Sequence, residues 1–250
     1  MQMQKDDTSL ATFGDIRTSV ALLTRIPVKA EFDRSAEAAW AYPLVGLPVG
    51  LITAIIVGLL LWMGVAAPIA AGIWIAITVV LTGAMHEDGL ADCADGFWGG
   101  FEKARRLEIM KDSQIGTYGM LALILSLGIR WMCIATILAA GGWLWPLLAM
   151  EVLSRATMPA IMHSLPHARE SGLSHAQGRP PMNAAWLAVG LAFAIGLVCL
   201  GWAVFWLAVL LGLATFALGA LAQGKIGGQT GDVLGATQQV LMVIGLIVLS

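Results

Sequence analysis

Apolar runs of about twenty residues recur along the chain and are separated by shorter polar connections. A helix needs about this length to cross the hydrocarbon core of a bilayer. We expect spans at Tyr42–Met63, Ala67–Ala84, Tyr118–Ala140 and Trp143–His163, two more from the run Ala184–Ala222 split near Gly201–Trp202, and a shorter last one at Val240–Leu249. The pattern predicts an all-α polytopic membrane protein with six or seven transmembrane helices.

Composition supports this class of protein. Hydrophobic residues make up 58% of the 250 residues and charged residues only 12%, whereas soluble domains carry about 25% charge. The net charge of −2 gives no reason to expect a nucleic-acid partner. The three cysteines form no metal-binding or disulfide pattern. We therefore treat 1–250 as a single integral-membrane domain in contact with the lipid bilayer.

The positions of the basic residues predict how the chain is oriented. Lysine and arginine occur in every second connection and are missing from the connections between. By the positive-inside rule the basic connections lie in the cytoplasm, which predicts a multi-pass protein of the cell inner membrane. The residues that carry this argument are Lys5, Arg17, Arg25, Lys29, Arg34, Lys103, Arg105, Arg106, Lys111, Arg169, Arg179 and Lys225.

The segment 1–39 precedes the first span and is polar, with no secretory signal. Phe13, Ile16, Val20 and Leu23 follow one another at helical spacing, with polar residues between them. This predicts a cytoplasmic amphipathic helix that ends before Pro27. Such a helix either lies on the membrane surface or packs on the bundle, and both interpretations stay open.

The densest polar feature follows the second span, in the predicted cytoplasmic segment 85–117. Asp88, Asp92 and Asp95 have i, i+4, i+7 spacing, which places them within about 60° of one another on a helix. Hard cations such as Mg²⁺ bind oxygen ligands of this kind. The alternative is a solvated helix end. Gly89 and Gly96 flank the stripe, where a missing side chain would allow a phosphate to approach.

Basic residues and a further carboxylate follow in the same segment. Lys103, Arg105 and Arg106 either hold a diphosphate or act only as positive-inside anchors, and the sequence leaves both open. Asp112 is a candidate metal ligand or general base, with a helix N-cap as the alternative.

Charged residues also fall inside predicted spans. Arg130 lies within the third span, and Glu151 and Arg155 stand i, i+4 in the fourth. Charges at membrane depth are costly unless paired or hydrated, so they indicate either function or an ion pair that locks two helices together.

Two further polar segments are predicted as cytoplasmic loops. The segment 163–183 carries Arg169, a candidate phosphate contact. The segment 223–239 is rich in glycine but lacks the P-loop pattern. Its backbone amides at Gly227–Gly231 are candidates to cradle phosphate oxygens. The alternative is a flexible re-entrant turn.

These residues carry a family resemblance that covers nearly all of the chain. The string His86-x-Asp-Gly-Leu-Ala-Asp-x-x-Asp-Gly and the string Arg-Leu-Glu-Ile-Met-Lys-Asp-Ser-x-x-Gly-Thr at Arg106–Thr117 resemble the cobalamin synthase family, adenosylcobinamide-GDP ribazoletransferase. Further matching strings are Leu23–Val28, Pro43–Gly46, Ser154-Arg155, Ala168–Leu173 and Gly227–Ala236. Two positions depart from the expected pattern. Glu87 stands where an apolar residue is usual, and Gln239 stands where Glu is expected, which puts a ligand role at 239 in doubt.

The resemblance implies transfer of the cobinamide phosphate moiety of adenosylcobinamide-GDP to α-ribazole or its 5′-phosphate. GMP is released, and adenosylcobalamin or its phosphate forms in the last assembly step of cobalamin biosynthesis, with Mg²⁺ as cofactor. It implies metal binding by Asp88, Asp92 and Asp95, and catalysis by Asp112, the favoured base, and Asp95. A homo-oligomer or association with other enzymes of the pathway is a further expectation. The substrate-binding residues implied are His86, Lys103, Arg105, Arg106, Lys111, Ser113, Arg155, Arg169, Gly228, Thr230 and Asp232.

Two rival interpretations remain. A CDP-alcohol phosphotransferase making phospholipid also uses clustered Asp residues, but it would need an Arg shortly after the second Asp, and position 93 is Cys. A secondary transporter would use Arg130, Glu151 and Arg155 as its pathway. Transporters tend to show paired halves, and no internal repeat is found here.

Overall fold

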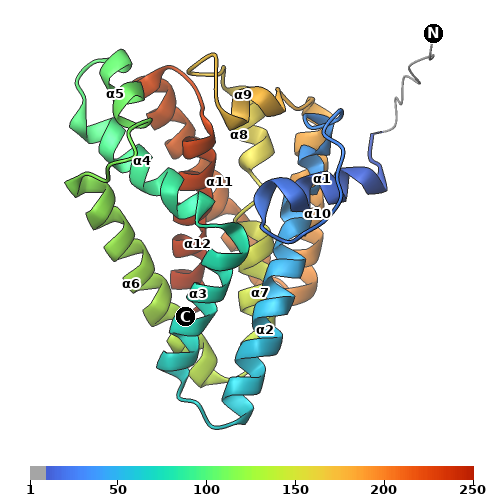
Figure 1. The fold of residues 1–250 in the computed structure, drawn as a ribbon. Coiled ribbons are helices and arrows are strands. Elements are labelled where there is room, and N and C mark those ends of the chain that lie inside the picture. Colours follow the sequence, from blue (N-terminus) through green and yellow to red (C-terminus); the bar gives the residue numbers. More distant parts are fainter. Residues whose placement is uncertain (1–9) are drawn as a thin grey trace.

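The computed structural model describes residues 10–250, which fold into a helical bundle without a named strand (Figure 1). The predicted all-α class is confirmed. In chain order the elements are α1 (Phe13–Leu23), the 3₁₀ helix η1 (Glu37–Val45), α2 (Gly46–Trp62), α3 (Ala67–Thr82), α4 (Met85–Gly99), α5 (Lys103–Ile109), α6 (Thr117–Ala140), α7 (Leu144–Leu153), α8 (Met158–Ser164), α9 (Leu173–Gln177), α10 (Met182–Leu200), α11 (Ala203–Ile226) and α12 (Gly231–Leu249).

Five helical segments of the described chain are long and apolar enough to cross a membrane. They are Glu37–Trp62, Thr117–Ala140, Met182–Leu200, Ala203–Ile226 and Gly231–Leu249. The bent pair α3 and α4 brings the number to six, so the protein is polytopic but seven spans are not reached. The long apolar run divides at residues 201–202, as its glycine predicts.

The fourth predicted span, Trp143–His163, is wrong as a continuous helix. A turn at residues 154–157 divides it into α7 and α8. At about 1.5 Å per residue, the ten residues of α7 cover only about 15 Å, half of the hydrocarbon core. Pro159 stands in the first turn of α8, where its missing N–H costs nothing.

The second predicted span ends in a sharp bend that positions the acidic helix. Gly83 and Ala84 both adopt left-handed backbone angles, with φ of 65° and 59°. For a residue with a Cβ such as Ala84, this conformation costs about 1 kcal/mol. The Arg25 backbone N–H donates to the carbonyl of Leu81 (2.7 Å) just before the bend. α4 then leaves α3 at 90°.

The predicted cytoplasmic loops are more helical than expected. The segment 85–117 is mostly α4 and α5. Of the segment 223–239, only residues 227–230 lie outside helices, because α11 runs on to Ile226 and α12 begins at Gly231. The prediction of a loop over all of 223–239 is therefore wrong. The last predicted span, Val240–Leu249, is accordingly only the second half of α12.

The predicted amphipathic helix is α1, and it packs on the bundle against η1. Val20 and Leu23 are buried as expected, whereas Phe13 is exposed. On its packed side Asp15 accepts a hydrogen bond from the Trp40 indole (2.8 Å). Lys5 lies outside the described residues.

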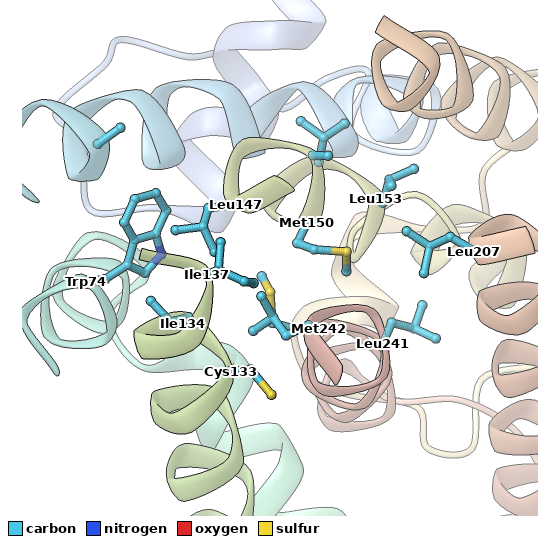
Figure 2. Packing of buried hydrophobic residues seen from close by; sticks show 14 of the residues in the cluster. Trp74, Cys133, Ile134, Ile137, Leu147, Met150, Leu153, Leu207, Leu241 and Met242 are labelled. Atoms are coloured by element: carbon cyan, nitrogen blue, oxygen red, sulfur yellow. The ribbon is translucent and has the colours of Figure 1, made fainter. Parts of the chain in front are cut away.

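The main hydrophobic core lies between the spans (Figure 2). Trp74 of α3, Ile134 of α6, Met150 of α7 and Leu241 of α12 all contribute to it. α12 packs against α4, α6, α7 and α11, which makes it the central helix. α4 and α5, which carry the acidic stripe and three of the predicted basic residues, lie with α9 at the end of the bundle opposite the α2–α3 connection (Figure 1).

Candidate active site

The acidic stripe lies on α4, as its spacing predicts. Asp88 is exposed, Asp92 is half-buried and Asp95 is buried. α4 packs most extensively against α12. Where the two helices cross, their backbones come so close that a Cβ on Gly89 would lie 2.7 Å from the carbonyl oxygen of Asp232. The crossing therefore brings the first turn of α12 beside the stripe.

The two glycines of this motif serve packing between chain segments. Gly89 contacts the backbone of Asp232, and Gly96 contacts Met110 and the backbone of Arg106. On the facing helix, a Cβ on Gly235 would lie 3.1 Å from the Cα of His86. The expectation that Gly89 and Gly96 leave open space for a phosphate is wrong, because neighbouring chain segments already fill that space.

Asp95 caps the sixth helix. Its two carboxylate oxygens accept the backbone N–H groups of Gly116 (2.7 Å) and Gly119 (2.9 Å) at the start of α6. A negative charge here also complements the helix dipole. The carboxylate thus satisfies donors that a helix N-terminus leaves unpaired, and its predicted metal and catalytic roles stay predictions.

A carboxylate from another helix joins the stripe instead. Asp92 lies within electrostatic reach of Asp232, Asp88 and Asp95, and of the Arg169 guanidinium. Arg169 donates to the Asp232 carboxylate across 2.9 Å. Two distant segments, 85–99 and 230–232, therefore contribute negative groups around one cation.

This donor set fits a hard cation in its chemistry. Between residues 10 and 250, no three His, Cys, Asp or Glu side chains converge as a preformed metal cage requires. Mg²⁺, however, is usually held by one or two carboxylates together with water and substrate phosphates. Asp88 and Asp92, with Asp232 nearby, fit binding of that kind.

The turn at residues 227–230 is fixed to the loop that carries Arg169. Ala168 N–H donates to the Gln229 carbonyl (2.9 Å), and Gln229 N–H donates to the Pro166 carbonyl (2.8 Å). A Cβ on Gly228 would overlap the Pro166 carbonyl, so only glycine allows this approach. The turn is thus anchored, which argues against the alternative of a flexible turn.

A small polar pocket, about 170 Å³ when the open solvent at its mouth is counted, lies at this junction. Thr230 caps α12 by accepting the Val233 N–H, and its hydroxyl donates to Asp232 (3.1 Å). The pocket brings together the predicted residues Arg169 and Thr230. Its lining is His167, Arg169, Ser171, Gly172, Leu173, Ser174, His175, Gln229, Thr230 and Gly231.

His167 on the rim of this pocket is a neutral hydrogen-bond partner. Burial, followed by the nearby His175 and Arg179, lowers the pKa of its imidazole. The Gln229 amide lies 2.9 Å from its Nδ1, which accepts in the neutral ring. The other end of the same amide accepts from Ser174 (2.6 Å). His167 therefore helps to orient the Arg169 loop.

The basic residues on α5 divide by role. Arg106 donates to the carbonyls of Gly100 (2.9 Å) and Lys225 (2.8 Å), so it fastens α5 to the end of α11. Arg105 pairs on the surface with Glu108. Lys103 lies against Gly227, close to the anchored turn.

The remaining predicted residues of this segment lie in the exposed turn between α5 and α6. Lys111, Asp112 and Ser113 are all exposed. Asp112 accepts the Gln114 N–H (3.0 Å) within that turn. The N-cap of α6 is Gly116, so the alternative interpretation of Asp112 as that helix cap is wrong.

The charges inside the bundle are paired. Arg130 of α6 donates to Glu87 of α4 (2.9 Å) and to Gln239 of α12 (2.7 Å), and the Gln239 amide donates to Glu87 (3.0 Å). The two positions that depart from the expected family pattern thus share one guanidinium. Sequence reasoning singled out Arg130 but did not find either partner.

Arg155 pairs with Glu151, which lies four residues earlier in α7. It is almost fully buried and donates to the Glu151 carboxylate (3.0 Å) and to the Glu151 carbonyl. The next residue back, Ser154, accepts from the Gln238 amide (3.0 Å). These contacts describe a buried polar layer beneath the site, and the predicted substrate contact by Arg155 stays a prediction.

Comparison with known proteins shows which family the chain belongs to. A family model described as cobalamin-5-phosphate synthase matches residues 15–250. The chain belongs to this family. An adenosylcobinamide-GDP ribazoletransferase of Bradyrhizobium diazoefficiens is 43% identical over 97% of this chain and 95% of its own.

Two further relatives of the same name agree. That of Mesorhizobium japonicum is 42% identical over 94% of this chain and 92% of its own, and that of Sinorhizobium medicae is 41% identical over 95% and 97%. No solved structure matches the chain. Because the match to the synthase family spans 15–250, it includes α4, the Arg169 loop and the first turn of α12.

Proposed function

We propose that this chain transfers the cobinamide phosphate of adenosylcobinamide-GDP to α-ribazole or its 5′-phosphate. GMP is released, and adenosylcobalamin or its phosphate is formed. The observation that carries the proposal is the convergence of Asp92, Asp232 and Arg169 within a chain matched over its length by ribazoletransferases. Transfer from a diphosphate needs a cation that neutralises the phosphate charge and a carboxylate that accepts the proton of the attacking hydroxyl. This site offers both kinds of group.

The reaction breaks a phosphoanhydride bond and forms a phosphate ester bond. The ribazole hydroxyl oxygen attacks the cobinamide-bound phosphorus, the bond from that phosphorus to the bridging oxygen breaks, and GMP leaves with that oxygen. Arg169 and the amides at the start of α12 would hold the phosphate oxygens. Asp88 and Asp92 would hold Mg²⁺, which when bound neutralises negative charge on the diphosphate and the leaving GMP.

The proton of the attacking hydroxyl passes to a carboxylate. We propose Asp112 as the base, with Asp95 as the second candidate. Asp112 is exposed in a turn and can approach a substrate without breaking a buried contact, whereas Asp95 already accepts two amide hydrogens. General-base catalysis contributes about 10²–10⁴-fold, so Asp112→Asn should lower kcat by about that factor with little change in KM. An unchanged kcat would exclude Asp112 as the base.

The site faces the cytoplasm in the proposed topology. α4, α5 and α9 share one end of the bundle (Figure 1). The connections that contain these helices carry lysine and arginine, which the positive-inside rule places in the cytoplasm. The enzyme would then act at the inner surface of the cell inner membrane. Reporter fusions at Gly141 and near Gly201 should read as periplasmic, and a cytoplasmic signal at either site would overturn this orientation.

The deciding experiment is a GMP-release assay on purified protein in lipid. It contains adenosylcobinamide-GDP and α-ribazole, with and without Mg²⁺. Asp88→Asn and Asp92→Asn should each reduce release at least about a hundredfold. Asp33→Asn, which changes an exposed carboxylate that lines neither pocket, should keep the wild-type rate. Wild-type rates in both site variants would refute the metal assignment, and no release by the folded wild type would refute the function.

A further inference from the structure

A second pocket lies beside the polar one and is lined almost wholly by apolar atoms. Its enclosed space is about 30 Å³, and about 380 Å³ when the open solvent at its mouth is counted, so a ligand larger than water enters only as flexible wall residues move. Three methionines form part of its wall, and methionine is an adaptable wall material because its side chain is unbranched and flexible. The lining is Leu22, Leu23, Tyr42, Met85, His86, Met158, Met162, Leu173, Ser174, Gln177, Gly231, Leu234 and Gly235.

Two polar atoms in this lining lack partners. His86 is 1% exposed, and its Nε2 makes no hydrogen bond. The Gln177 Oε1 is likewise buried without a partner. Leaving such an atom unpaired costs about 1–3 kcal/mol. An apolar pocket with two unsatisfied polar atoms suits a ligand that is apolar in body and carries a few polar atoms at defined places.

The position of the pocket shows which part of a substrate would reach it. Leu173, Ser174 and Gly231 line both this pocket and the polar pocket that contains Arg169. Gly231, which lines both pockets, directly precedes Asp232 of the acidic site. A molecule with its phosphate or hydroxyl end at the acidic site can therefore extend its other end into the apolar pocket.

We propose that this pocket binds the heteroaromatic base of the acceptor nucleoside, an inference that rests on the proposed function. The base of α-ribazole is an apolar bicyclic ring with one free ring nitrogen, which accepts a hydrogen bond. His86 Nε2–H donates to that nitrogen, and Gln177 Oε1 accepts a ribose hydroxyl. The ring packs among Met85, Met158 and Leu234.

The test compares α-ribazole with the corresponding α-riboside of indole, which has a carbon in place of the free nitrogen. Binding is measured by equilibrium dialysis without the GDP donor, and KM is measured by GMP release. The wild type should bind α-ribazole about tenfold or more tightly, as expected for one buried hydrogen bond. His86→Phe should raise Kd and KM for α-ribazole about tenfold and abolish the preference, with KM for adenosylcobinamide-GDP unchanged.

A second variant and a control keep the test decisive. Leu173→Trp changes an exposed wall residue and should also raise KM for α-ribazole. His163→Phe removes an imidazole that contacts the Pro180 carbonyl outside the pocket and should change neither constant. Equal affinity of the wild type for the two ribosides, or an unchanged KM in His86→Phe, overturns the proposal. His86-dependent binding of α-ribazole without GMP release upholds the pocket and refutes the proposed function instead.

Discussion

Glu87 and Gln239 lie on different helices, and the Gln239 amide donates to the Glu87 carboxylate across 3.0 Å while both contact Arg130. Each residue departs from the pattern that the sequence analysis expects, and both contact the same guanidinium. An acid at 87 with an amide at 239 leaves one carboxylate for the buried guanidinium, as would an apolar residue at 87 with an acid at 239. In this protein Glu87 is the carboxylate that pairs with Arg130.

This relationship predicts the outcome of exchanging the two side chains. Glu87→Gln leaves Arg130 buried without a carboxylate and should destabilise the protein by about 3–5 kcal/mol. The double variant Glu87→Gln with Gln239→Glu restores one carboxylate and should recover most of that loss. Thermal unfolding in detergent measures both. A double variant no more stable than Glu87→Gln would show that the carboxylate cannot act from position 239.

Asp95 should behave as a helix cap when it is mutated. Asp95→Asn replaces one acceptor of two backbone N–H groups with a donor, so we expect a loss of about 1–3 kcal/mol in unfolding free energy. The Mg²⁺ concentration for half-maximal GMP release should stay near the wild-type value, whereas Asp92→Asn should raise it. A raised Mg²⁺ requirement at unchanged stability would instead make Asp95 a ligand.

Gly89→Ala should separate α4 from α12. Its Cβ would lie 2.7 Å from the Asp232 carbonyl oxygen, and backbone atoms cannot move aside as a flexible side chain would. We expect stability and GMP release both to fall, the first by about 1–3 kcal/mol. Gly190→Ala is the matched control, because no atom lies within 4 Å of its added Cβ in α10. Similar behaviour of the two variants would contradict the close crossing.

His167 should make stability depend on pH. Its pKa is lowered in the folded protein, so the unfolded chain binds more protons once the pH falls below the ordinary histidine value of about 6.5. The contribution of His167 is complete above that pH and is lost as the pH falls through the lowered pKa. Unfolding curves from pH 8 to 5 should show this slope, and His167→Gln should reduce it. An identical slope in the variant would assign the effect to another group.

Hydropathy and spacing alone determine much of this protein. The apolar runs coincide with the five membrane-crossing segments, although the last run covers only the second half of its helix. Asp88, Asp92 and Asp95 lie on one helix, where carboxylates at i, i+4 and i+7 share a face. The resemblance carried by the acidic and glycine-rich strings agrees with the family match over 15–250. These properties depend on neighbours within one or two helical turns, which is the range over which a sequence pattern carries information.

Only the tertiary structure decided the partners of those side chains. The crossing of α4 and α12 at Gly89 places Asp232 and Arg169 beside Asp92, and the start of α6 occupies Asp95. Arg130 finds Glu87 and Gln239 at separations of 43 and 109 residues. No local pattern encodes such contacts, because they depend on the 90° bend after α3 and on the packing of helices distant in sequence. The turn at residues 154–157 escaped prediction because hydropathy measures how apolar a segment is, while the helix break arises from backbone conformation.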